Sequence, residues 1–153
     1  MKLSTRGDYA TRVVLELSAL GAPRPLAVSE LASRTGVSPK YLEQIMSSLR
    51  AACVVRGERG VHGGYVLARH PDSLTVGEVV RAMDGPLAPS PCASQSVHVA
   101  CPAYRCPSEE TCVLRGLWLD VRDAIAAVLD TTTFAELAER QQRQVSGIDR
   151  YCI

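Results

Sequence analysis

The amino-acid sequence predicts a mainly helical chain with one small β-hairpin, arranged as a winged helix-turn-helix plus a long C-terminal helix. The run S-P-K-Y-L-E-Q-I from Ser38 to Ile45 is typical of a helix with a serine cap and a proline in its first turn. The glycine-rich, basic run R-G-E-R-G-V-H-G-G-Y-V-L from Arg56 to Leu67 favours a hairpin. This order of elements is typical of proteins that grip duplex DNA.

The helices before the hairpin are indicated by capping and turn residues. Thr5 and Asp8 have the spacing of a capping box, and apolar residues then recur at helical intervals. Residues 21–25 are rich in Gly and Pro and should end that helix. Ser29 is expected to cap a second helix, and Gly36 can supply a left-handed turn after it. The predicted helices cover residues 5–20, 29–35 and 38–50.

The later elements follow similar signals. Thr75 with Glu78, and Thr133 with Glu136, have capping-box spacing. Cys53 is interpreted as a core residue at the start of the first hairpin strand. The predicted elements are strands at 53–56 and 65–68, helices at 75–83 and 109–130, and a short helix from residue 133, with no strong pattern after residue 143.

These elements divide the chain into three segments. Residues 1–84 form the predicted DNA-binding domain, residues 85–108 a cysteine-rich loop broken by prolines, and residues 109–153 a dimerisation helix with a tail. Residues 1–70 carry a formal charge of +5, whereas the remainder carries −4, although the whole chain is only +1. A basic first part is suited to phosphate, and the acidic remainder to a different partner.

Several other classes of protein are not indicated. The N-terminal residues lack an apolar run resembling a signal peptide, and no stretch has the roughly 20 apolar residues that span a bilayer. We therefore expect a cytoplasmic protein. No nucleophile triad, phosphate loop or paired-carboxylate motif appears, so an enzyme is not expected.

The predicted DNA contacts lie on the third helix and in the hairpin. Gln44 can pair with adenine, Lys40 can bond guanine or phosphate, and Arg59 at the hairpin tip is the main minor-groove candidate. Phosphate contacts should make binding strongly salt-dependent. The complete set is Ser38, Pro39, Lys40, Tyr41, Gln44, Arg50, Arg56, Arg59, His62, Gly63 and Gly64.

Four of the six cysteines lie within 21 residues, with the spacing C-x8-C-x4-C-x5-C. They are Cys92, Cys101, Cys106 and Cys112. A reducing compartment argues against a disulfide scaffold, and thiolates grouped in a loop favour an iron–sulfur cluster. Zinc is an alternative, but the paired C-x2-4-C knuckles of structural zinc sites are absent. His98 and Asp8 are weaker ligand candidates, because a loop histidine and a capping aspartate have ordinary structural roles.

The chain resembles the Rrf-two family of bacterial winged-helix regulators, particularly its IscR-like and NsrR-like iron–sulfur sensors. The matching runs are K-L-S-T-R-G-D-Y-A at 2–10, S-P-K-Y-L-E-Q-I, R-G-E-R-G-V-H-G-G-Y-V-L-A-R ending at Arg69, L-T-V-G-E-V-V at 74–80, and C-V-L-R-G-L-W from Cys112. The resemblance covers nearly the whole chain.

This resemblance implies a homodimer that binds a palindromic operator and holds a 2Fe-2S or 4Fe-4S cluster near the partner's DNA-binding domain. It implies that Cys106 and Cys112 are ligands, together with Cys92 or Cys101, and that Asp8 supplies a carboxylate as in NsrR-like members. Arg115 stands where IscR-like members have a histidine. Dimerisation is expected through Leu114, Leu117, Trp118, Val121, Ile125 and Val128 on the long helix.

The expected function is a transcription regulator, favoured as a repressor, whose operator affinity depends on the cluster. Redox state, nitric oxide or iron and cluster supply are the expected signals. One alternative is a cluster-free regulator with a zinc or thiol site that senses a metabolite or a partner protein, since some relatives linked to cysteine metabolism hold no cluster. A second alternative is an electron carrier or cluster-transfer protein on the same scaffold.

Overall fold

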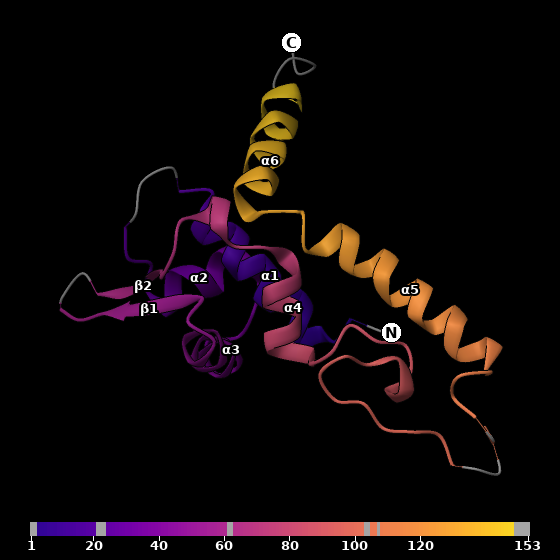
Figure 1. Cartoon of the computed structure of the whole chain (residues 1–153). Coiled ribbons are helices and arrows are strands. Elements are labelled where there is room, and N and C mark those ends of the chain that lie inside the picture. The colour runs from indigo at the N-terminus through magenta and orange to yellow at the C-terminus, as the bar shows by residue number, and fades with distance from the viewer. Residues whose placement is uncertain (1–2, 21–23, 61–62, 103–104, 107, 149–153) are drawn as a thin grey trace.

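The computed structural model describes residues 3–20, 24–60, 63–102, 105–106 and 108–148 (Figure 1). Its helices and two strands confirm the predicted fold class. In chain order the elements are α1 (Thr5–Ser18), α2 (Val28–Thr35), α3 (Pro39–Ala51), β1 (Val55–Glu58), β2 (Gly64–Leu67), the short 3-10 helix η1 (Pro71–Ser73), α4 (Val76–Asp84), the short 3-10 helix η2 (Pro91–Ala93), α5 (Val113–Leu129) and α6 (Phe134–Ile148).

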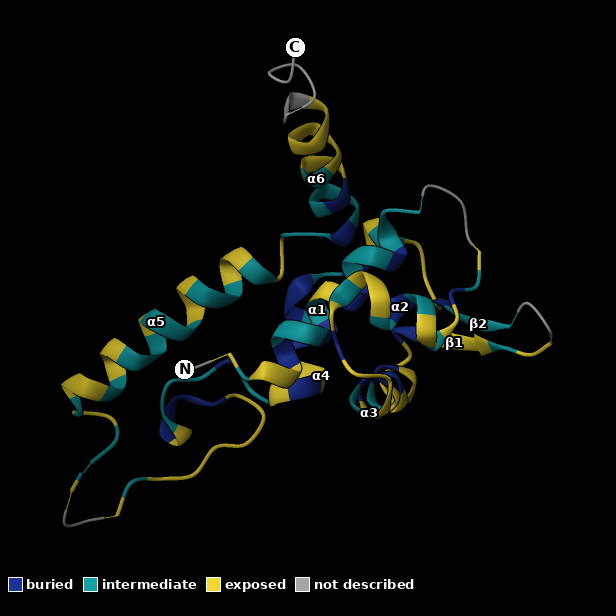
Figure 2. Ribbon diagram, turned by 180° about the vertical axis from the view of Figure 1, so that it is seen from behind, coloured by how far each residue is buried: buried dark blue, intermediate teal, exposed yellow. Residues whose placement is uncertain are grey.

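Helix α1 is at the centre of the molecule and packs on α2, α3, α4 and the start of α6. Its apolar residues Val13, Val14 and Leu17 recur at helical spacing and are buried. They meet buried leucines of α2 and α3, including Leu31 and Leu42. Figure 2 shows this buried centre in dark blue, and it forms the body that carries the hairpin.

The start of α1 differs from the prediction. Ser4, not Thr5, is the cap: its hydroxyl accepts a hydrogen bond from the backbone N–H of Gly7 at 3.0 Å. The carboxylate of Asp84, at the end of α4, accepts from the backbone N–H of Ser4 at 2.8 Å. This contact across 80 residues fixes where α1 begins, so the predicted capping role of Asp8 is wrong.

The helix-turn-helix is formed by α2, Gly36 and α3. Gly36 has a φ of +70°, which confirms the predicted left-handed turn. Helix α2 begins one residue earlier than expected, at Val28, and Ala27 rather than Ser29 occupies its cap position. Helix α3 begins at Pro39 as predicted, although the Ser38 side chain makes no capping hydrogen bond.

The hairpin is an antiparallel pair in which Val55 faces Leu67. Its first strand starts later than predicted because α3 continues to Ala51 and Cys53 adopts a left-handed conformation, with a φ of 55°. That turn leaves Cys53 exposed, so its interpretation as a core residue is wrong, and Val54 and Val55 are buried instead.

Leu26 extends the hairpin on its other side by pairing with Tyr65. The two residues exchange backbone hydrogen bonds of 3.0 and 2.9 Å. A Cβ atom on Gly64 would lie 2.3 Å from the Leu26 carbonyl oxygen, so only glycine allows this approach. The start of β2, next to the hairpin turn, is thereby attached to the segment that follows α1.

The later helices confirm some predicted boundaries and change others. The Thr75–Glu78 capping box opens α4 as predicted. Helix α5 begins at Val113, four residues later than expected, with Cys112 in the cap position. Helix α6 is longer than predicted and runs to residue 148, through the region that lacked a strong pattern. Its first residue, Phe134, is fully buried in the core of the body.

Helix α5 extends away from the body as an arm (Figures 1 and 2). It contains no buried residue, and Val113, Leu114, Leu117 and Val128 are exposed. Among the described residues, no helix is long and apolar enough to cross a membrane.

Candidate functional site

Helix α3 presents one polar face to solvent. Leu42, Ile45 and Leu49 hold the opposite face in the core. The exposed positions recur at intervals of three and four residues, so they lie on one side of the helix. They are Lys40, Glu43, Gln44, Ser47 and Arg50, following the exposed Ser38 and Pro39 at its start. This face contains both predicted base-reading side chains, Gln44 and Lys40.

Tyr41 is placed differently from these residues. It is half-buried, and its ring meets that of Tyr9 edge to face, with 6.1 Å between the ring centroids. This pair holds the start of α3 on α1, so Tyr41 has a packing role beside its predicted DNA contact. The sequence interpretation missed Ser47 on the exposed face and Arg6, an exposed residue of α1 that donates to Ser48 of α3. The three-residue spacing from Gln44 could have indicated Ser47.

The hairpin brings two predicted cations to the surface. Arg59 is exposed near the tip, and Arg56 is exposed with its guanidinium 3.1 Å from the Glu58 carboxylate. Gly63 and Gly64 have a structural reason for being glycine: at Gly63 a Cβ would lie 2.5 Å from the Glu58 carbonyl oxygen. Their predicted contact with DNA stays a prediction. His62 lies outside the described residues.

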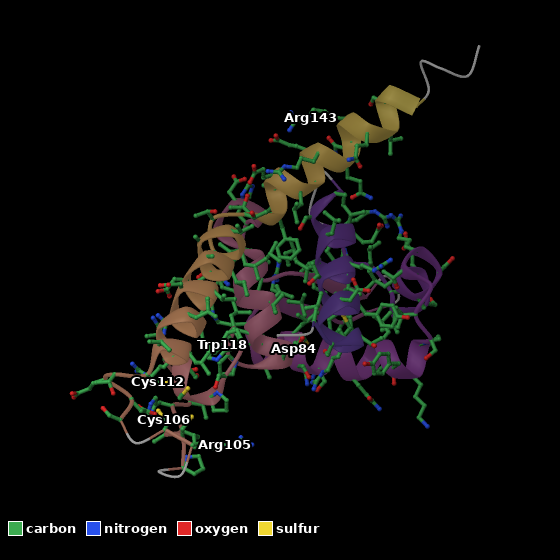
Figure 3. All side chains as sticks on the ribbon, turned by 90° about the vertical axis from the view of Figure 1, so that its right-hand side faces the viewer. Asp84, Arg105, Cys106, Cys112, Trp118 and Arg143 are labelled. Atoms are coloured by element: carbon green, nitrogen blue, oxygen red, sulfur yellow. The ribbon has the colours of Figure 1, made fainter. Side chains whose placement is uncertain are left out.

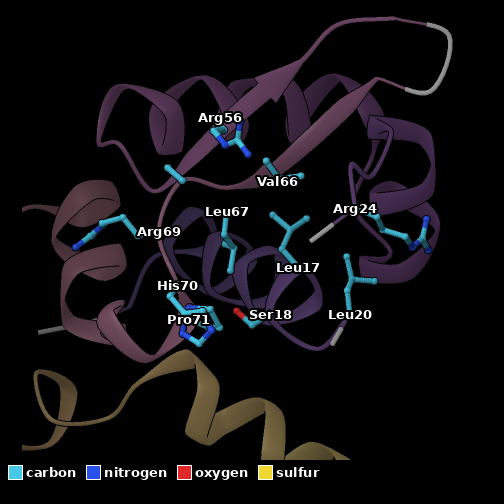
Figure 4. A pocket seen from close by; sticks show the side chains of 11 residues that line it. Leu17, Ser18, Leu20, Arg24, Arg56, Val66, Leu67, Arg69, His70 and Pro71 are labelled. Atoms are coloured by element: carbon cyan, nitrogen blue, oxygen red, sulfur yellow. The ribbon is translucent and has the colours of Figure 1, made fainter. Parts of the chain in front are cut away.

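A pocket of about 300 Å³ lies between the end of α1, the hairpin and the segment leading into η1 (Figure 4). Leu17 and Val66 form part of its apolar lining, and Arg56 lies at its edge near Val66. Arg69 also lines the pocket but pairs with Glu78 of α4 at 3.0 Å. Arg56 therefore borders both the outer surface of the hairpin and the space beneath it.

The four clustered cysteines lie around the N-terminal end of α5. Cys92 is buried in η2, whereas Cys101, Cys106 and Cys112 are partly exposed. Cys112 is the cap residue of α5, because the helix begins at Val113 and not at residue 109 as expected. Figure 3 shows Cys106 and Cys112 side by side at this end of the helix.

The thiols are close enough to change one another's protonation. The Cys92 thiol, by hydrogen bonding, raises the pKa of Cys101, and the Cys112 thiol does the same to the pKa of Cys106. The backbone amide of Arg115 is the main cause that lowers the pKa of Cys112. Cys112 is therefore more readily deprotonated than Cys101 or Cys106, and the thiolate is the form that binds metals and attacks electrophiles.

The thiols of the four clustered cysteines are suitable ligands for a soft metal centre, but their side chains do not form a complete coordination site. Within the part of the chain that the structure describes, no three Cys, His, Asp or Glu side chains are positioned as a metal site. The Oε1 atom of Glu109 is buried with no hydrogen-bond partner, and this carboxylate also raises the pKa values of Cys101 and Cys106. A cation in this region would neutralise both the thiolates and this carboxylate.

Arg115 and Arg122 attach the Cys92 segment to α5. Nε of Arg115 donates to the carbonyl oxygen of Cys92 at 3.1 Å, and a guanidinium nitrogen of Arg122 donates to that of Ala93 at 2.9 Å. The other oxygen of Glu109 lies 3.7 Å from Arg115 and 3.0 Å from the His98 ring. No local pattern in the sequence indicates these arginine contacts, because they join residues more than 20 positions apart.

Asp8, the predicted additional ligand, does not join this group within one chain. Its carboxylate pairs with Arg12 one turn along α1 at 3.0 Å. It also lines an apolar groove of about 560 Å³ between α1, α4 and α5. Val121, Ile125 and Val128 of α5 line the same groove, which faces the surface.

The predicted dimerisation residues differ in exposure. Leu114, Leu117 and Val128 are 59%, 48% and 62% exposed, which is far more than large apolar side chains of a buried helix. The others, Trp118, Val121 and Ile125, are half-buried, and Ile125 packs on the core of its own chain. One side of the C-terminal half of α5 therefore packs against the body, and another side of the helix lacks a partner within the described chain.

Comparison with known proteins gives consistent matches to this arrangement. The family model described as "Rrf2: Iron-dependent Transcriptional regulator" matches residues 3–140. The transcriptional regulator CymR of Bacillus subtilis is 37% identical over 138 residues, covering 90% of each chain. IscR of Escherichia coli is 31% identical over 148 residues, covering 96% of this chain and 86% of IscR.

The solved structure of B. subtilis CymR, described as the global cysteine regulator, superimposes with a TM-score of 0.71. At 34% identity it covers 92% of this chain and 98% of that structure. The relatives named above are all helix-turn-helix transcriptional regulators. The chain therefore belongs to the Rrf2 family of DNA-binding transcription regulators, and it is not an enzyme.

Proposed function

We propose that the protein is a homodimeric repressor whose operator affinity is set by an iron–sulfur cluster held at Cys92, Cys101, Cys106 and Cys112. The observation that carries this proposal is the position of the cysteines at one end of α5, whose other end is joined to the DNA-binding body. Redox change, nitric oxide or iron supply would act at the cysteine end of α5. The change would reach the DNA-binding body through the other end and alter its affinity for the operator.

The DNA contacts of this proposal lie on the exposed face of α3 and on the hairpin. Gln44 and Lys40 reach base edges in the major groove, while Arg59 reaches the minor groove or flanking phosphates. Arg50, Arg6 and Arg56 add positive charge around α3 and the hairpin. A palindromic operator follows from the dimer, because two symmetry-related α3 helices read two half-sites.

Homodimerisation is supported by the exposed apolar side of α5 and by the groove beside it. A second copy offers the matching partner, since an isologous dimer buries the same surface on both chains. Leu117→Glu should give monomers in analytical ultracentrifugation, because burying an unpaired carboxylate in the interface is costly. Val145→Glu, at an exposed position of α6, is the matched control and should leave the dimer intact.

An iron–sulfur cluster is supported by the donor set and by the lowered pKa of Cys112. Thiolates are the usual ligands of such clusters, and the spacing lacks the paired knuckles of structural zinc. When bound, the cluster would supply a centre that gains or loses an electron and reacts with oxygen or nitric oxide. The residues of this chain would supply the thiolate ligands, and Cys112 would connect them directly to the start of α5.

The link between the two sites is a change in the position of α5 relative to the body. A tenfold change in operator affinity needs only about 1.4 kcal/mol of coupling. Small movements of one long helix suffice, provided that two arrangements of the dimer differ in the separation of their α3 helices.

The alternative is a zinc-dependent or thiol-dependent regulator of the same fold that senses a metabolite or a partner protein. The relation to CymR, described as a global cysteine regulator in B. subtilis, favours this alternative. The paired thiols, Cys92 with Cys101 and Cys106 with Cys112, also suit reversible oxidation.

The deciding experiment is anaerobic purification of the full chain, followed by iron and sulfide analysis and an absorption spectrum. A duplex selected by the protein from a random pool then serves as the probe in gel shifts with loaded and cluster-free protein. We expect iron, sulfide and visible absorption, and affinities that differ by about tenfold or more. Cys106→Ser should remove both the colour and the difference, whereas Cys53→Ser, at an exposed cysteine distant in sequence from the loop, should remove neither.

A colourless, iron-free protein would contradict the cluster proposal. If its DNA affinity then responds to zinc or to thiol oxidation, the alternative holds. Identical affinities of the loaded and cluster-free forms would contradict control by the cluster, even if iron is bound.

A further inference from the structure

The segment that carries Cys92 has an unusual attachment to the rest of the chain. Cys92, Ala93 and Ser94 are 5%, 1% and 8% exposed, although they belong to a proline-rich loop with little regular structure. The two carbonyl groups at Cys92 and Ala93 accept hydrogen bonds from arginines of α5. Buried backbone carbonyls require such partners, and here both are charged side chains.

The two arginines are matched to this task by their spacing. Arg115 and Arg122 are seven residues apart, so they lie on one side of α5, two turns from each other. Their side chains are only 29% and 16% exposed, which is low for arginine. Glu109 and Asp123 lie beside their guanidinium groups, at 3.7 and 2.6 Å, and restrict their orientation.

We propose that Arg115 and Arg122 are positioning residues that hold the Cys92 segment on α5 in the metal-free protein. They act on the backbone on either side of the Cys92–Ala93 peptide bond and not on the sulfur. Cys92 is therefore kept beside Cys101 and close to the start of α5 before any metal or oxidant arrives. Movement of Cys92 is transmitted to α5 through the same two hydrogen bonds.

The hydrogen bonds of Arg115 and Arg122 to the carbonyls of Cys92 and Ala93 are called the arginine clamp below. A role of this clamp in signalling rests on the proposed function, but the clamp itself does not require a cluster. Its test uses the full chain, reduced, treated with a chelator and kept anaerobic. Iodoacetamide is added, samples are quenched over time, and alkylation of each cysteine is followed by peptide mass spectrometry. The reaction of a buried thiol reports local opening of the segment that covers it.

In the unaltered chain, Cys92 should react much more slowly than the exposed Cys53. Arg115→Met retains the length of the side chain but loses its donors, and we expect it to raise the Cys92 rate about tenfold, which corresponds to about 1.4 kcal/mol of opening free energy. Arg122→Met should raise that rate as well. The Cys53 rate should be unchanged in both variants.

Two further variants separate the clamp from general effects. Arg115→Lys retains the positive charge and a hydrogen-bond donor but lacks the planar guanidinium group. Cys92 should therefore be better protected from alkylation in this variant than in Arg115→Met, but less well than in the unaltered chain. Arg143→Met, a matched change on the exposed face of α6, should leave every cysteine rate unchanged. Circular dichroism shows whether each variant is folded, and if Arg115→Met unfolds, Arg122→Met and Arg115→Lys carry the test.

Folded Arg115→Met and Arg122→Met with Cys92 as protected as in the unaltered chain would overturn the proposal. A loss in the free energy of global unfolding large enough to account for the faster Cys92 reaction would also overturn it, because that result indicates global and not local opening. The cluster proposal is judged separately by iron content, so failure of one proposal is distinguishable from failure of the other.

Discussion

The two ends of α5 are attached to the molecule in different ways. At the C-terminal end, both guanidinium nitrogens of Arg81 bond the two oxygens of Asp130, at 2.6 and 2.8 Å. The backbone N–H of Val76 donates to Thr132 at 3.0 Å, and Phe134 is buried in the body. Toward the N-terminal end, the contacts are those of Arg115, in the first turn, and of Arg122, at mid-helix, with backbone carbonyls of a loop.

This difference indicates which part of the helix is able to move. Regular packing and paired backbone groups fix the C-terminal end to the body, so in the proposed mechanism this end serves as the pivot. The N-terminal end is held by the contents of the cysteine loop, and a chemical change there alters its support. In the proposed sensing mechanism, signals therefore enter at the end beside the cysteine loop and leave at the end that is packed on the body.

The strongest test of the pivot is Phe134→Ala. This ring is fully buried where α5 passes into α6, and removing it leaves a cavity that α1 and η1 cannot easily fill. We expect a loss of about 3–5 kcal/mol in the free energy of unfolding, measured with urea. Val145→Ala, at an exposed position of the same helix, should change it by less than about 0.5 kcal/mol. A loss no larger than that of the control would show that the pivot is not rigid.

Gln44→Ala separates DNA reading from signal transmission. Loss of a bidentate base contact should weaken specific binding by about 1–3 kcal/mol, or roughly 5- to 150-fold, in a titrated gel shift. Because Gln44 lies in the body, the factor should be the same for loaded and cluster-free protein. Unequal factors would mean that the signal changes the DNA contacts of α3 itself, and not the separation of the two α3 helices in the dimer.

Arg59→Ala should have a smaller and differently shaped effect. If Arg59 meets a phosphate, its removal reduces the slope of log affinity against log salt by about 1, equally for all sequences. Binding measured at several salt concentrations gives this slope. An unchanged slope combined with relaxed preference for A·T pairs would instead place Arg59 on base edges in the minor groove.

Much of the fold could be predicted because it depends on local signals. Pro39 at the start of α3, Gly36 after α2 and the Thr75 capping box of α4 are each determined by residues within one turn. The gathering of the four cysteines also followed from their spacing in a single loop. Contacts between distant segments decided the rest.

Two errors and one contact that was not anticipated show what the local patterns do not reveal. Ser4 replaces the expected Thr5 as the cap of α1 because Asp84, from α4, binds it. Cys53 turns outward because the chain leaves α3 in a left-handed conformation that a β-prone pattern does not reveal. Gly64 is required by the close passage of Leu26, which no local pattern near the hairpin indicates.

In the candidate site too, local patterns predicted the exposed residues but not the contacts between distant segments. The exposed face of α3 is a matter of helical periodicity, so Gln44 and Lys40 were predictable. Arg6 was missed because its place beside α3 depends on the packing of α1. The contacts of Arg115 and Arg122 with η2 were missed for a similar reason, since a charged residue on an amphipathic helix is ordinarily expected in solvent.

The smallest expected effect concerns the ion pair at the pivot. Hydrogen bonds from Arg81 lower the pKa of Asp130 below its value of about 3.9 in an unfolded chain. The pair therefore stabilises the fold above that value, and its contribution is lost as the pH falls through the folded pKa. Because both side chains are about 40% exposed, we expect at most about 1 kcal/mol.

Asp130→Asn should therefore lower the free energy of unfolding by this amount at neutral pH and flatten its pH dependence below about pH 4. Gly77→Ala provides a second route to the same change, because its Cβ would lie 1.9 Å from Asp130 Oδ1 and displace the carboxylate. Urea unfolding at a series of pH values measures both variants. If they retain the pH dependence of the unaltered chain, the fixed end of α5 depends on Phe134 and the backbone pairing near Thr132 rather than on charge.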